Sequence, residues 1–229
     1  MRIHKIITIG RVAACVATFL GGTGLTAARG PAPAGAQTPA SGSPNVLASD
    51  NFSDPTSGLF PPISPQPDKW QVGYVNGEYQ VAGIDMTADN AAITTDAVFG
   101  DARVAADARV DGDTGNTELG IVCRWAGPGG YELDVYPGGG TIVVSKLRGG
   151  QRTNLIFRDQ DPNVLSGSQT NHLELTCAGR TITARVNGVT IDSVQDTTFT
   201  RGSTGLSIAR ALNPGTVSVR FSNFLVTQP

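Results

Sequence analysis

From residue 47 onward, the chain contains no stretch with the 3.6-residue apolar period of an amphipathic helix. Short segments that alternate apolar and polar residues recur instead, and Gly, Asn, Asp and Pro separate them. The clearest segments are 117–125, 131–136, 141–147, 172–177, 181–187, 205–209 and 217–226, and weaker ones lie near 47–52, 69–75, 78–83 and 101–110. About a dozen short strands joined by tight turns predict an all-β, antiparallel sandwich.

The N-terminal segment has the composition of a secretory signal. Residues 1–36 contain four basic residues and no acidic one, an apolar stretch from Val12 to Leu20, and the small-residue pattern Ala34-Gly35-Ala36. We therefore predict a signal peptide at 1–36, a flexible Pro/Ser linker at 37–46 and one folded domain at 47–229. The predicted location is secreted, either extracellular or in the cell envelope, and retention of the leader as an anchor is the alternative.

The charge of the chain disfavours two classes of partner. The sequence has 17 Lys and Arg against 19 Asp and Glu; four of the cations lie in the leader, so the rest has 13 against 19 and a net charge of −6. An acidic chain is a poor match for nucleic acid or for an anionic membrane surface. No stretch after the leader is apolar enough to cross a bilayer, so we predict no integral membrane span in the mature chain.

Few histidine and cysteine side chains remain after the leader. They are one histidine, His172, and two cysteines, Cys123 and Cys177. This set cannot supply a zinc site with several His or Cys ligands, so we predict no metal centre and no cofactor. Structural calcium is an alternative at the Asp111-x-Asp113 loop, although the spacing of its oxygen ligands is incomplete and favours a hairpin turn. An even number of cysteines in an exported protein predicts a disulfide, and two buried free thiols are the alternative.

The loop at 126–130 suggests how the two strands that flank it pair. A simple hairpin around AGPGG sets Cys123 opposite Leu133 and Glu132 opposite Arg124. In this register the apolar residues share one face and the charged residues share the other, because side chains alternate along a strand.

A second turn, at 178–179, gives the same kind of prediction. It pairs Leu175 with Ile182 and points Cys177 toward the core, as the first hairpin does for Cys123. Both sulfur atoms then face inward, which makes the predicted disulfide geometrically reasonable.

Four segments together resemble a known group of folds. They read SDNFSDPTSG; GIVCRW with GGYELDVYPGGG; NHLELTCAGRTITARVNGVTIDSVQDTTFTRGSTGLSIA; and VRFSNFLV. In this order they resemble the concanavalin A-like lectin/glucanase superfamily, specifically the laminin-G-like domains grouped with the 3-keto-disaccharide hydrolase domain. The resemblance covers nearly all of 47–229 and implies a two-sheet antiparallel jelly-roll sandwich with one concave face. Members commonly bind or process carbohydrate.

The heptapeptide YELDVYP at 131–137 carries part of a glycosidase pattern. Retaining enzymes need two carboxyl groups about 5 Å apart, and relatives in this superfamily place them on one strand as Glu-x-Asp-x-Glu. This chain supplies Glu132 and Asp134, but Tyr136 stands where the second Glu is needed. Glu132 and Asp134 are therefore candidate catalytic residues, and the predicted cross-strand ion pair of Glu132 with Arg124 favours a structural role instead.

A glycan-binding site requires less than a catalytic one. Sugars are held by an aromatic surface and a few planar donors and acceptors in a shallow groove. Candidate ligand-binding residues on one polar face are Glu118, Arg124, Glu132, Asp134 and Tyr136. We predict a secreted, non-catalytic module whose partner is a carbohydrate or cell-surface glycan. The alternatives are a carbohydrate-active hydrolase or lyase of the 3-keto-disaccharide type, and a structural or adhesive domain without a small ligand.

Overall fold

The computed structural model describes most of the chain after the predicted linker. The described residues are 45–57, 59–62, 70–86, 90–115, 117–127, 129–210 and 215–229. The predicted signal peptide at 1–36 and nearly all of the predicted linker at 37–46 lie outside them. Both remain predictions.

The described residues form strands and no helix, and so include no helix that could cross a membrane. The strands are β1 Val46–Asp50, β2 Trp70–Val75, β3 Glu78–Met86, β4 Asn90–Phe99, β5 Ala102–Val110, β6 Thr117–Trp125, β7 Gly130–Tyr136, β8 Thr141–Arg148, β9 Gln151–Arg158, β10 Asn171–Ala178, β11 Thr181–Val186, β12 Val189–Gln195, β13 Gly202–Arg210 and β14 Gly215–Thr227. The predicted all-β class is confirmed.

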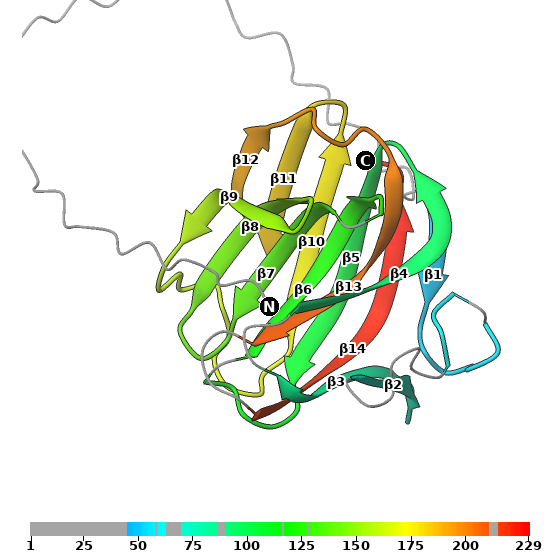
Figure 1. Ribbon diagram of the computed structural model, residues 1–229, viewed down its shortest axis with the longest axis vertical. Helices are drawn as coiled ribbons and strands as arrows, with labels where there is room; N and C mark the ends of the chain where they lie inside the picture. The colour runs from blue at the N-terminus through cyan, green and yellow to red at the C-terminus, as the bar shows by residue number, and fades with distance from the viewer. Residues whose placement is uncertain are drawn as a thin grey trace, which may run out of the picture. The chain divides into compact units, whose positions relative to one another are not determined.

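The strands build two antiparallel sheets (Figure 1). The eight-stranded sheet runs β12-β11-β10-β5-β14-β3-β2, with β1 also paired to β14. The six-stranded sheet runs β4-β13-β6-β7-β8-β9. Strand β6 lies against β5 and β10 of the other sheet, so the two sheets pack as layers of a sandwich. Half of the strand pairings across the two sheets, such as β5 with β10 and β4 with β13, join strands distant in sequence, as expected for a jelly roll.

The core lies between the sheets and is built from alternate residues of each strand. In β6 and β7 these include Leu119, Ile121 and Leu133, all without exposed surface. Cys123 and Cys177 belong to the same core and form the predicted disulfide across the two sheets, with their Cα atoms 6.6 Å apart. The alternative of two free thiols is wrong.

Both predicted hairpin registers are wrong by two residues. Glu132 lies opposite Val122 and not opposite Arg124, and the same shift applies to every pair predicted across the 126–130 loop. Leu175 lies opposite Ala184, two positions beyond the predicted partner. The error leaves the assignment of faces intact, because a shift by two preserves the alternation of side chains.

A β-bulge explains the shift at the first hairpin. Arg124 has a φ of 51°, and the pairing of β6 with β13 is irregular next to it. Arg124 and Trp125 therefore leave the ladder with β7, which ends at Cys123 opposite Tyr131. A bulge adds a residue to one strand and turns the side chains that follow.

Candidate functional site

Four of the five predicted ligand-binding residues lie on one face of the six-stranded sheet. Asp134 lies opposite Gly120 and Glu132 opposite Val122, so both carboxyl groups share the face that carries Glu118. Tyr136 follows in the same phase of β7. The neighbouring Leu133 points the other way, into the core.

Glu118, Glu132 and Asp134, here called the carboxyl cluster, are almost completely buried, with 4%, 1% and 1% of their surface exposed. Arg152 of β9 is the cation that pairs with them. Its guanidinium lies 3.3 Å from Oε2 of Glu118 and 3.8 Å from Oε2 of Glu132, and it donates a hydrogen bond to Oδ2 of Asp134. Its Nε also donates to the hydroxyl of Ser145, 3.0 Å away.

The carboxyl cluster holds its protons more tightly than ordinary carboxyl groups do. Burial raises the pKa of Glu118 to about 7, against the opposing effect of Arg152. Burial also raises the pKa of Glu132, and the pKa of Asp134 rises well above its usual range through burial and the charge of Glu132. Oε2 of Glu132 accepts no hydrogen bond from the described residues. One guanidinium does not satisfy three buried carboxylates, so protonation is the remaining way to reduce their charge.

Gly120 makes room for this arrangement. A Cβ at this position would lie 2.5 Å from Oδ1 of Asp134 and 2.5 Å from the carbonyl oxygen of Leu133, and closer still to Oγ of Ser207. The hydroxyl of Ser207 itself donates to Oδ1 of Asp134 over 3.4 Å. Because Gly120 has no side chain, the Asp134 carboxyl can pack against β6.

The same face carries a depression beside the carboxyl cluster. This depression, here called the hollow, has a volume of about 340 Å³, and its lining residues are Tyr136, Thr141, Val143, Arg152, Asn154 and Phe157. Phe157 is 54% exposed, although it is a large apolar residue, and the side chain of Arg152 is 31% exposed. The hollow therefore offers two aromatic rings, an amide and a guanidinium to solvent.

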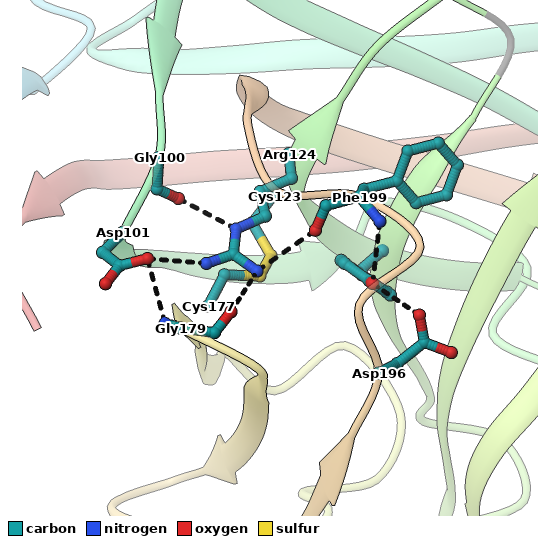
Figure 2. Close-up of a disulfide and its surroundings, with 9 residues drawn as sticks. Gly100, Asp101, Cys123, Arg124, Cys177, Gly179, Asp196 and Phe199 are labelled. Carbon is teal, nitrogen blue, oxygen red and sulfur yellow. Dashed lines mark hydrogen bonds and ion pairs between the residues drawn. A yellow bond between two sulfur atoms is a disulfide. The ribbon is translucent and has the colours of Figure 1, made fainter.

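Arg124, the fifth predicted ligand-binding residue, does not join this set. Its side chain is 2% exposed and donates to the carbonyl oxygens of Gly100, Gly179 and Phe199 at 2.9, 2.9 and 3.2 Å. It also pairs with Asp101 at 2.7 Å. Figure 2 shows this network beside the Cys123–Cys177 disulfide. The predicted ion pair of Arg124 with Glu132 is wrong, because the bulge carries Arg124 to the end of the sandwich, where it joins three loops.

Arg152 takes the place that the prediction gave to Arg124, and sequence reasoning missed it. Strand β9 was not among the predicted segments because its first half, QRTN, is entirely polar. A usable signal was present: Gly149-Gly150 follows an alternating segment and both glycines have positive φ, as a two-residue hairpin turn requires. The resulting register sets Asn154 opposite Ser145 on the hollow's face.

The Asp111-x-Asp113 loop also behaves as a turn. Asp113 accepts a hydrogen bond from the backbone N–H of Gly115 over 2.9 Å, and Asp111 accepts one from Nε of Arg220 over 2.9 Å. A carboxylate that pairs with arginine has little need of a cation. Structural calcium stays an untested alternative.

No known protein family matches this chain, and no curated protein matches it. Solved structures do resemble it. The carbohydrate binding module CBM66 from Bacillus subtilis is 13% identical, with a TM-score of 0.58 over 70% of this chain and 92% of that one. A β-glucanase from Bacillus licheniformis is 10% identical, with a TM-score of 0.59 over 82% and 100%. A Bacillus subtilis protein of unknown function with a galectin-like fold is 12% identical, with a TM-score of 0.55 over 80% and 96%.

These similarities confirm the predicted fold. The chain is a concanavalin A-like jelly-roll sandwich. At such low identity the similarity shows the fold alone, since one fold carries many functions. The finer resemblance to the 3-keto-disaccharide hydrolase group therefore remains a prediction.

Proposed function

We propose that this protein is a secreted glycan-binding module and that the hollow on the six-stranded sheet is its binding site. The observation that carries the proposal is the exposure of Phe157 beside Tyr136 and Arg152 in one depression. Aromatic rings pack against the C–H faces of sugars, while planar donors such as a guanidinium and an amide bind hydroxyl groups. The fold, which a carbohydrate binding module shares, supports this reading.

The disulfide supports the proposed location. Disulfides persist in oxidising compartments, and Cys123–Cys177 joins the two sheets through the core. The disulfide therefore favours export of this chain to an oxidising compartment.

Truncation of the two rings tests the binding site. Against the glycan that binds best on a glycan array, Phe157→Ala and Tyr136→Ala should each weaken binding by roughly 10-fold, because each ring lines the hollow and offers apolar contact to a sugar. Val98→Ala is the matched control, since Val98 is also an exposed apolar residue but lies on β4, at the opposite edge of the sheet. Unchanged affinity in both ring variants would refute the site.

Hydrolysis is the second candidate function, and one observation favours it: the buried Oε2 of Glu132, beside Asp134, accepts no hydrogen bond from the described residues. Two features oppose it. Both carboxyl groups lie beneath Arg152, and Tyr136 occupies the position of the missing acid/base. Turnover of polysaccharides or 3-keto glycosides that Glu132→Gln abolishes would establish catalysis. A protein that neither binds nor cleaves any glycan would instead fit a structural or adhesive domain.

A further inference from the structure

Arg152, which lines the hollow, has more N–H groups than its described neighbours use. A guanidinium carries five N–H groups. Three of them are engaged by described residues: Nε–H by Ser145, one N–H of Nη1 by Glu118 and one of Nη2 by Asp134. The other two N–H groups, one on each terminal nitrogen and here called the free N–H groups, donate no hydrogen bond to a described residue, although Nη2 also lies 3.8 Å from Oε2 of Glu132. Because the side chain is partly exposed in the hollow, a ligand can reach it.

The position of this guanidinium is set before any ligand arrives. Contacts reach it from three neighbouring strands, through Glu118 of β6, Asp134 of β7 and Ser145 of β8. A donor held in this way loses little conformational freedom on binding, which favours affinity and fixes the spacing of the two free N–H groups.

The charge of Arg152 is already balanced by the carboxyl cluster. Glu118, Glu132 and Asp134 all lie within ion-pair distance of its guanidinium. Arg152 is the only charged side chain among the described residues that line the hollow. An anionic sugar would therefore meet no uncompensated cation and would approach buried carboxyl groups of its own sign.

The hollow is also of a size that suits a small part of a glycan. Its volume, about 340 Å³, lies at the lower end of the range for small-molecule sites. Tyr136, Val143 and Phe157 supply apolar contact, and Asn154 supplies both a donor and an acceptor.

We propose that the hollow binds a neutral sugar unit whose two adjacent hydroxyl groups accept hydrogen bonds from the two free N–H groups of Arg152, and that it discriminates against uronic acid sugars. The proposal rests on the proposed glycan-binding function and names the substrate class and the specificity-determining residue of that site. The carboxyl cluster acts as a positioning group and does not touch the sugar.

Matched ligands test the proposal directly. Oligosaccharides of gluco, galacto and manno configuration, each paired with its C6-oxidised uronate, are compared at pH 8 and low salt by calorimetry and saturation-transfer NMR. At least one neutral member should bind, and its uronate should bind more weakly by roughly 10-fold or more.

The variant Arg152→Lys tests the same donors from the side of the protein. It should keep a positive charge over the carboxyl cluster but lose the paired donors, and binding should fall roughly 10- to 100-fold. Arg158→Lys, on the same strand, is the matched control and should bind normally.

Deoxygenated ligands test the proposal with the unaltered protein, so a folding defect cannot cause the result. Deoxygenation of either of the two adjacent hydroxyl groups should reproduce the loss with the unaltered protein. A uronate that binds as tightly as its neutral partner, an Arg152→Lys protein with full affinity, or a deoxy ligand with full affinity would each overturn the inference while leaving glycan binding intact. Failure of every glycan to bind would overturn the proposed function and this inference with it.

Discussion

Replacement of Arg152 by glutamine should destabilise the protein in a pH-dependent manner. The substitution removes the cation that faces three carboxyl groups, each of which is at least 95% buried. Two unit charges about 4 Å apart attract by about 4 kcal/mol at an effective dielectric of 20. Loss of one partner from a buried ion pair costs about 3–5 kcal/mol, because the remaining charge stays buried and unpaired.

The cost should depend on pH because the carboxyl groups can take up protons. Arg152 lowers the pKa of all three groups, so its removal raises these pKa values further. When the pKa of an acidic group is higher in the folded protein than in the unfolded chain, the protein loses stability as the pH rises from the unfolded-state pKa through the folded-state pKa. At pH 5 we therefore expect a loss near that of neutral hydrogen bonds, about 1–2 kcal/mol, and at pH 8 a larger loss that approaches about 3–5 kcal/mol.

Urea denaturation at pH 5 and pH 8, followed by tryptophan fluorescence, measures both values. Arg158→Gln is the control: it breaks an ion pair with Asp192 whose side chains are 44% and 42% exposed, and should cost about 1 kcal/mol or less at either pH. The reasoning is refuted if the two variants lose equal stability, or if the loss in Arg152→Gln does not grow with pH.

Three other perturbations probe the same architecture. Gly120→Ala should destabilise by about 1–3 kcal/mol in chemical denaturation, because its Cβ meets backbone and side-chain atoms, whereas Gly100→Ala, with only one atom within 4 Å, should be close to neutral. Removal of the disulfide by the paired change Cys123→Ser and Cys177→Ser should lower the free energy of unfolding by about 4 kcal/mol, given the sequence separation of 54 residues, and an unchanged melting temperature would contradict this. The unaltered protein should lose up to about 3 kcal/mol between pH 4.5 and about pH 7 from the raised pKa of Glu118, and Glu118→Gln should flatten this part of the stability curve.

Much of the fold and part of the site could be predicted from the sequence. Alternation of apolar and polar residues assigns each side chain to a face, and this assignment is insensitive to an error of two residues in register. For this reason Glu118, Glu132 and Asp134 were correctly placed on one face, and Cys123 and Cys177 were correctly pointed into the core, although both hairpin registers were wrong.

The partner of the carboxyl groups could not be predicted in the same way. Arg124 was the predicted partner because a regular strand would place it on the polar face. The bulge at this residue moves it away, and that bulge depends on how β6 pairs with β13, a strand about 80 residues away along the chain. Arg152 reaches the carboxyl cluster across β8, so its contact needs the order β6-β7-β8-β9 within the sheet and not only one hairpin.

By itself, the sequence determined most of the strands and their faces, the disulfide and the acidic character of YELDVYP at 131–137, because these follow from local periodicity and composition. Strands β4 and β9 were not among the predicted segments. Only the tertiary structure decided that these acids are buried, that Arg152 balances them, and that Tyr136 and Phe157 flank a hollow beside them. The physical reason is that burial and charge pairing depend on strands brought together from distant parts of the chain, which no local pattern encodes.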